Sequence, residues 1–355
     1  MKRSWARMAA MGAAFLFVSW QQSLAAGSDV TLRIGSYGGT FDVLEKKFVS
    51  ELFTEHTGIK VEFIDAAPTA HLAKLIASKG REAPYDLVIL DGDVQTQAID
   101  AGVLAKLDPS IVKNLQYVYP EVRNQDGYGP AIMLLSIGIA YNPEKFAAAG
   151  IPEPTSWADL WDPRLAGHVS VPSLENVMGR VFMIAAAKLA GGDLNSLDKG
   201  IAKIAELKVQ SYYVSSTQLE PKFQSGDVWV APWINQRAWG MALRGQPMKF
   251  VIPKEGGFGD VGTIDMIADS QHKAEAQAYI NFHLDLLPQL GLAFEFLCGP
   301  TNSLLAEPLK AYPEVAQRFP SSPAALAQLN RVDWHQFWPK YPQLLEAWNR
   351  TLLNK

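Results

Sequence analysis

From residue 31 to about residue 101, the pattern of apolar and polar residues predicts a strand, a helix, a strand, a helix and a strand in that order. Three apolar segments have the length and pattern of strands, namely 31–34, 60–64 and 85–90. Between them, apolar side chains recur at helical spacing and each helix stops at a glycine: Phe41, Leu44, Phe48 and Leu52 before Gly58, then Leu72, Leu75 and Ile76 before Gly80. A further helix is predicted over 94–101. This order predicts an open α/β sheet.

Two loops of this predicted sheet are candidates for a binding site. The first strand leads into 35–40 (GSYGGT), and the third leads into Asp91-Gly92-Asp93. Ligands of open α/β sheets bind outside the carboxyl ends of the strands, so we expect both loops to face one cleft. Gly38 and Gly39 suit a turn with positive φ, and the loop amides could also hold an anionic group at the helix start.

The rest of the chain predicts a second α/β unit and a return to the first. The stretch 128–142 is long, apolar and extended, as expected of a crossing between two lobes. The elements predicted after it are a helix at 157–160, a strand at 168–171, a helix at 197–207, strands at 250–257 and 261–268, and helices from 273 on.

The N-terminus has the features of a secretory signal peptide over residues 1–25. Lys2, Arg3 and Arg7 form a basic region, and residues 8–20 are apolar but short for a membrane span. Small residues around Ser23-Leu24-Ala25 predict cleavage before Ala26. No cysteine follows the apolar run to carry a lipid anchor. We therefore expect an exported, soluble, periplasmic chain.

Length, charge and cysteine content narrow the class of protein further. A mature chain of about 330 residues is long enough for two domains. Without the three basic residues of the leader, the 32 lysines and arginines fall to 29 against 36 acidic residues, a net charge of −7. Such an acidic chain is not expected to bind nucleic acid. The single cysteine, Cys298, has no partner for an internal disulfide and is expected to be buried and inert.

The sequence gives no sign of catalysis or of a cofactor. None of the six histidines stands in H-E-x-x-H, no G-x-S-x-G occurs, and the loop at 35–39 does not have the spacing G-x-G-x-x-G. We expect no enzyme activity, no cofactor and no structural metal. Tyr212-Tyr213 keeps one metal alternative open, because ferric-ion binders of a two-lobed fold use adjacent tyrosines.

Four motifs together resemble the periplasmic polyamine-binding (spermidine/putrescine-binding) proteins of ABC importers and their wider solute-binding family. They are YDLV at 85–88, TSWADLW at 155–161, IPKEGG at 252–257 and GPTN at 299–302. The resemblance implies a two-lobed periplasmic-binding-protein fold of class α/β, each lobe an open sheet, joined by hinge strands. It implies a first lobe of residues 26–135 and 266–355, with part of the C-terminal helices bridging the lobes, and a second lobe of 136–265. It also implies a small-molecule ligand and an inner-membrane permease as partners.

The same resemblance implies which residues meet the ligand. Tyr37 falls near the family's first-loop aromatic residue, and Trp233, in WVAPWIN, matches its stacking tryptophan. Arg180 stands where the family has a carboxylate, Gly262 or Thr263 aligns with a second carboxylate, and Asp91 or Asp93 replaces an aromatic residue. The full set of expected ligand-binding residues is Tyr37, Gly38, Gly39, Asp91, Asp93, Glu175, Arg180, Trp233, Asn235 and Thr263.

These departures predict a cleft with both signs of charge, Arg180 facing Asp91, Asp93 or Glu175. Such a cleft would suit an amine-bearing or zwitterionic solute, since arginine is a planar fork of donors for a carboxylate. A ferric-ion or anion-binding protein of the same fold is the alternative. Each residue also has a structural explanation: Arg180 in a surface ion pair, Trp233 in the core, Asp91 and Asp93 as helix caps, and the glycines as a turn.

Overall fold

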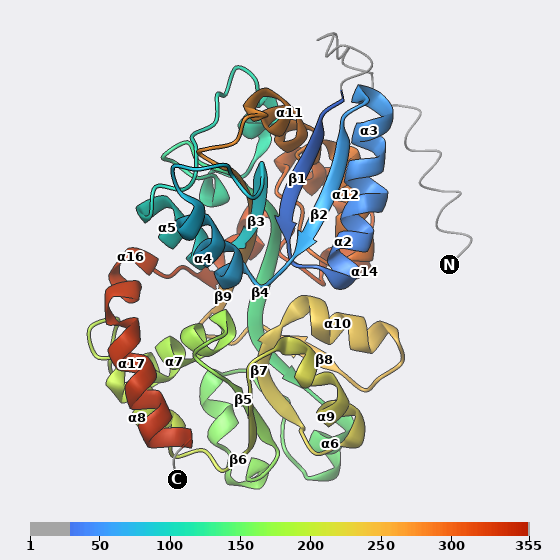
Figure 1. Ribbon diagram of the computed structural model, residues 1–355. Helices are drawn as coiled ribbons and strands as arrows, with labels where there is room; N and C mark the ends of the chain where they lie inside the picture. The colour runs from blue at the N-terminus through green and yellow to red at the C-terminus, as the bar shows by residue number, and fades with distance from the viewer. Residues whose placement is uncertain (1–28, 354–355) are drawn as a thin grey trace.

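The computed structural model describes residues 29–353, so the predicted signal peptide lies outside the described residues. The chain folds into two α/β lobes, one above the other in Figure 1, with a long strand running through both. The expected two-lobed α/β fold is confirmed.

The first lobe is built on three parallel strands, β1 (Thr31–Ser36), β2 (Lys60–Asp65) and β3 (Leu87–Asp91). The predicted helix after β1 is continuous but changes pitch, as α2 (Gly39–Glu45), a π-helical turn at Lys46–Ser50, and α3 (Glu51–Thr57). Gly58 ends it in the left-handed conformation, φ 76°. The other two helices of this region are α4 (Pro68–Ser78) and α5 (Gly92–Asp100).

Two long strands connect the lobes. β4 (Ala131–Tyr141) is buried along its whole length and pairs with β9 (Gly257–Met266), which returns antiparallel beside it. β9 also pairs with β3, and β4 also pairs with the second-lobe strand β7 (Val230–Ile234). Hydrogen bonding is therefore continuous from one lobe to the other, in the order β2-β1-β3-β9-β4-β7-β5-β6.

The second lobe completes this sheet with β5 (Val169–Pro172), β6 (Val209–Tyr213) and the short β8 (Lys249–Val251). Its helices are α6 (Pro143–Ala148), α7 (Val177–Leu189), α8 (Asp198–Ile204), α9 (Glu220–Ser225) and α10 (Asn235–Leu243). The predicted helix at 157–160 is a 3₁₀ turn, Trp157–Trp161, closed by a capping box from Ser156 and Asp159. The predicted strand 250–257 stops after Val251, because Pro253 has no backbone donor and Gly256 takes a φ of 88°.

The chain after β9 is helical, as expected. It contains α11 (Lys273–His283), α12 (Leu286–Glu295), α13 (Ala306–Leu309), α14 (Pro313–Ala316), α15 (Pro323–Ala327), the two-residue strand β10 (Leu329–Asn330), α16 (Trp334–Phe337) and α17 (Tyr341–Trp348). Among residues 29–353, no helix has the length and apolar character needed to cross a membrane.

The last helices contact both lobes. α16 contacts α5 of the first lobe, whereas α17 runs down the second lobe beside α8, as Figure 1 shows in red. Phe337, Leu344, Trp348 and Leu352 are buried in the second lobe's core. These apolar side chains extend that core, so the C-terminal segment passes from one lobe to the other.

Candidate functional site

Strands β3 and β9 approach each other closely between the lobes, where the sequence predicts the binding cleft. Asp91 ends β3, and the chain turns at Gly92 into α5. A Cβ on Gly92 would lie 2.7 Å from Cγ2 of Val261 on β9, so only glycine permits this approach. The approach brings the Asp91-Gly92-Asp93 turn onto the strand segment that carries Asp260.

Tyr37 joins this turn from the end of β1. Its hydroxyl donates a 2.9 Å hydrogen bond to Oδ1 of Asp91, and its ring packs edge-on against Phe41 at 5.1 Å. Burial, and then the nearby carboxylates of Asp91 and Asp260, raise the pKa of Tyr37 well above its usual value. Tyr37 therefore stays a neutral hydrogen-bond donor. The two loops predicted to face one cleft do meet.

Arg180 on α7 of the second lobe forms an ion pair with Asp93 on α5 of the first lobe. The Arg180 side chain is 4% exposed and the Asp93 side chain is fully buried. A second guanidinium nitrogen, Nη1, donates to the backbone oxygen of Leu174 at 2.9 Å. The partner of Arg180 is thus a buried carboxylate across the cleft, and not a surface acid.

The C-terminal segment covers this ion pair. The Trp338 ring lies 5.1 Å from the Arg180 guanidinium carbon, and its Nε1 donates to the backbone oxygen of Asp93 at 2.9 Å. Tyr341 donates to the oxygen of Leu174 at 3.4 Å. We did not expect either residue at the site from the sequence, although the aromatic spacing of Trp334, Trp338 and Tyr341 is a signal for a packed surface.

Asp260 is the carboxylate that the sequence analysis missed. The resemblance placed the second carboxylate position at Gly262 or Thr263, but the acidic residue stands two or three positions earlier on the same strand. Asp260 and Gly262 lie on one face of β9, because side chains alternate along a strand. In the sequence, the one acidic residue among the glycines of GFGDVG (257–262) could have indicated Asp260 as a site residue.

The acidic groups of this cleft are held in partly desolvated positions. Burial raises the pKa of Asp91 to about 6, with a further contribution from Asp93, against the lowering effect of Tyr37 and Arg180. Burial, then Asp91 and Asp93, raise the pKa of Asp260 well above its usual value. Three carboxyl groups and the Arg180 guanidinium therefore lie in this region. The guanidinium is paired with one of the three carboxylates, that of Asp93.

Three expected site residues have structural roles instead. Trp233 is fully buried in the second-lobe core, where it stacks on Phe223 with ring centroids 5.6 Å apart. Asn235 is also fully buried; its Oδ1 accepts from the amide of Ser136 at 2.8 Å. Thr263 donates to Oδ2 of Asp265 at 2.7 Å. These contacts hold strand ends and core together, and they give each of the three residues a structural role.

The glycine loop forms the turn with positive φ that the sequence predicts, and Glu175 lies at the surface. Gly38 and Gly39 have φ of 77° and 61°, as a left-handed turn requires. The Gly38 amide donates to Oδ1 of Asp42 at 3.1 Å, so the chain's own carboxylate occupies the position proposed for an anion. Glu175 is exposed beside the N-terminus of α7. Asp91 stands at the N-cap of α5 but makes no side-chain cap hydrogen bond.

The groups considered for metal binding or catalysis lie away from the cleft. The Tyr213 hydroxyl donates to the oxygen of Pro232 at 2.5 Å inside the second lobe, while Tyr212 packs on Trp348. Cys298 is buried, and burial raises the pKa of its thiol. Within the described residues, no group of three or more His, Cys, Asp or Glu side chains is arranged to hold a metal ion.

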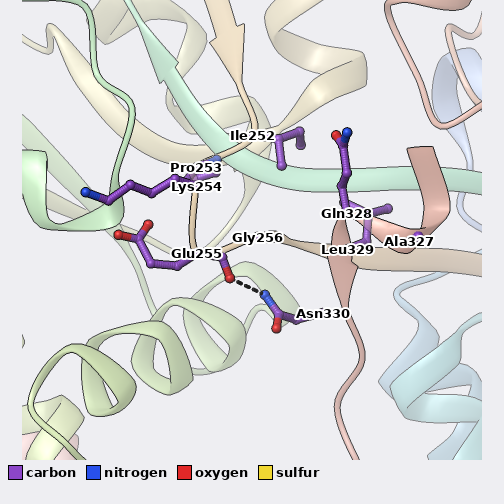
Figure 2. Close-up of a pocket in the computed structure, with 9 residues that line it drawn as sticks. All are labelled: Ile252, Pro253, Lys254, Glu255, Gly256, Ala327, Gln328, Leu329 and Asn330. Carbon is purple, nitrogen blue, oxygen red and sulfur yellow. Dashed lines mark hydrogen bonds between the residues drawn. The ribbon is translucent and has the colours of Figure 1, made fainter. Parts of the chain in front are cut away.

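A separate pocket of about 490 Å³ lies at the hinge, between 252–256 and 327–330 (Figure 2). Polar groups that line this pocket make hydrogen bonds that fix the loop 252–256. Asn330 donates to the backbone oxygen of Glu255 at 3.1 Å, and the Glu255 carboxylate accepts from Ser156 at 2.5 Å and from the Trp157 amide at 3.2 Å. None of the cleft carboxylates lines this pocket, so we do not assign the ligand to it.

Comparison with known proteins agrees with this fold. A family model described as bacterial extracellular solute-binding protein matches residues 82–321. The chain is similar to spermidine/putrescine-binding periplasmic protein 1 of Haemophilus influenzae, at 28% identity over 83% of this chain and 84% of that protein. It is 27% identical to the Escherichia coli spermidine/putrescine-binding periplasmic protein, over 75% and 76% of the two chains. A crystal structure of an ABC transporter from Clostridium perfringens superposes with a TM-score of 0.76 at 24% identity, over 90% of this chain and 99% of that one.

Proposed function

This chain belongs to the bacterial extracellular solute-binding protein family, and from that premise we propose that it captures an amine-bearing solute between its lobes for an ABC importer. The closed cleft would then present the bound solute to a permease in the inner membrane. Hinge strands of the kind seen in β4 and β9 suit such a closure.

The main support for an amine ligand comes from the charged side chains between the lobes. Asp91, Asp93 and Asp260 lie together, and the one guanidinium near them is already paired with Asp93. Among residues 29–353, Asp91 and Asp260 are left without a cationic partner, and burial disfavours their charged forms. A ligand ammonium group would supply that partner through charge-assisted hydrogen bonds.

The relatives support the same class of ligand, because those named above are spermidine/putrescine-binding periplasmic proteins. They also support a periplasmic location. The anionic alternative has less support, since it needs a free cation in the cleft and Arg180 is engaged by Asp93 and Leu174. Membership of a solute-binding family favours binding without turnover.

A calorimetric titration of the mature chain tests this proposal. We expect amines to bind, and dicarboxylates and ferric iron not to bind. A ligand at a hundred times its Kd should add about 2.7 kcal/mol to the free energy of unfolding, so a thermal-shift screen can precede the titration.

Two variants make the test specific to the cleft. Asp91→Asn is expected to weaken amine binding about 10- to 100-fold, because a charge-assisted hydrogen bond is worth roughly 1.5–3 kcal/mol. Asp198→Asn, an exposed aspartate on α8, is the matched control and should bind as the natural chain does. Binding of acids but not amines would overturn the proposal.

A further inference from the structure

The chain supplies one cation of its own to the cleft. Arg180 enters from the second lobe and reaches Asp93 in the first, and both side chains are almost completely buried. The Leu174 oxygen and the Trp338 ring hold the guanidinium from two other directions. A charge that is paired, hydrogen-bonded and covered in this way is a fixed part of the site.

The remaining acidic groups, Asp91 and Asp260, stand close to this ion pair on neighbouring strands. Gly92 packs directly on Val261, so the neighbouring Asp91 and Asp260 come from two strands to one place. Tyr37 fixes Asp91 by its 2.9 Å hydrogen bond. Two carboxyl groups beside one tyrosine hydroxyl suit one ammonium group, which has three donors to distribute.

Two polar atoms of the ion pair remain without a hydrogen-bond partner among the described residues. They are Oδ1 of Asp93, an acceptor, and Nε of Arg180, a donor. Both are buried, and buried polar groups without partners are costly. A ligand hydroxyl group offers a donor for Oδ1 of Asp93 and an acceptor for Nε of Arg180. A second ammonium group would satisfy only Asp93 and would be repelled by Arg180.

We propose that Arg180 occupies the place of a second cation, so that the cleft selects a solute with one ammonium group and an uncharged hydroxyl end over a diamine of equal length. The inference rests on the proposed function, since it concerns the selectivity of the same cleft. It makes Arg180 a specificity-determining residue that acts by neutralising Asp93.

Isosteric probes test this selectivity in the mature full-length chain. Butane-1,4-diamine and 4-aminobutan-1-ol differ only in replacing one ammonium group by a hydroxyl, and butylamine lacks both groups at that end. Calorimetry is expected to rank 4-aminobutan-1-ol at least tenfold above the diamine and also above butylamine. The opposite ranking of the first two would overturn the inference and leave amine binding intact.

Arg180→Gln tests the cause. It frees Asp93, so the diamine is expected to gain at least tenfold in affinity while 4-aminobutan-1-ol does not. Adding Asp93→Asn to that variant should abolish the gain, and this double variant removes both charges of the buried ion pair, so neither is left without its partner. Arg244→Gln, at a surface ion pair with Glu220, is the matched control. An unchanged diamine affinity in the folded Arg180→Gln variant would contradict the inference, whereas failure of every amine to bind the natural chain would reject the proposed function itself.

Discussion

The hydroxyl of Tyr37 lies 2.9 Å from Oδ1 of Asp91, although the two residues are 54 positions apart in the chain. They meet because β1 and β3 are adjacent and parallel, so both strands deliver their carboxyl ends to one edge of the sheet. Tyr37 donates a hydrogen bond to Asp91 and so fixes the orientation of the carboxyl group that we assign to the ligand.

Amine binding should depend on pH through Asp91. The pKa of Asp91 is raised to about 6 in the ligand-free cleft, and a bound cation favours the ionised form. Binding should therefore release a proton at about pH 6 and below, and affinity should increase as pH rises through about 6. Calorimetry in two buffers of different ionisation enthalpy measures the proton release. Asp91→Asn should reduce it, and an unchanged release in that variant would contradict the assignment.

Gly92→Ala is expected to weaken amine binding by disturbing the floor of the cleft. The new Cβ would lie 2.7 Å from Cγ2 of Val261, so the Asp91 turn and β9 must separate. Adding Val261→Ala removes the clashing methyl group and should restore most of the affinity. A Gly92→Ala variant that binds as tightly as the natural chain would show that the close approach is unimportant.

The ion pair between Arg180 and Asp93 should favour lobe closure in the absence of ligand. Arg180→Ala leaves a buried carboxylate without its partner, a loss of roughly 3–5 kcal/mol that opening of the lobes relieves by hydrating Asp93. We expect a larger radius of gyration by small-angle X-ray scattering. The paired change Arg180→Met with Asp93→Asn removes both charges and should stay more compact; equal expansion of the two variants would argue against this cause.

Trp233 should contribute to stability rather than to ligand binding. Truncation to alanine in the packed core is expected to cost about 3–5 kcal/mol of unfolding free energy. Trp233→Phe should cost less, because the buried Nε1 has no hydrogen-bond partner among the described residues. Urea unfolding measures both variants. A large loss of amine affinity in a stable Trp233→Phe variant would instead indicate a ligand contact.

Protonation of Asp265 should stabilise the folded protein, and this contribution is largest at low pH. It is fully buried, and burial raises its pKa to about 6 despite hydrogen bonds from Gln95, Thr263 and the Gly129 amide. The folded state therefore binds this proton more tightly than the unfolded state, whose carboxyl group titrates near 3.8.

The contribution is complete at low pH and is lost as pH rises from about 4 through about 6, by up to roughly 3 kcal/mol. Asp265→Asn removes this titration. Its unfolding free energy in urea should increase relative to the natural chain as pH is raised from about 4 to about 7. A pH-independent difference between the two proteins would contradict a raised pKa at this residue.

The sequence by itself determined the architecture. Three short apolar segments predicted β1, β2 and β3 with the helices between them, and the long apolar stretch 128–142 predicted β4. Local periodicity reports which side of an element is buried, and that is sufficient to define an α/β sheet. The resemblance carried by TSWADLW and IPKEGG added the second lobe and the family.

Only the tertiary structure decided the chemistry of the cleft. Whether Arg180 meets a ligand or a carboxylate depends on Asp93, 87 residues earlier, and whether Trp233 is core depends on Phe223 in another element. Asp260 and Trp338 reach the site through the return strand and the C-terminal crossing, which no local pattern reveals. Charge and burial at a site are properties of neighbours in space, so residue type and spacing could propose candidates, and only their packing could assign them.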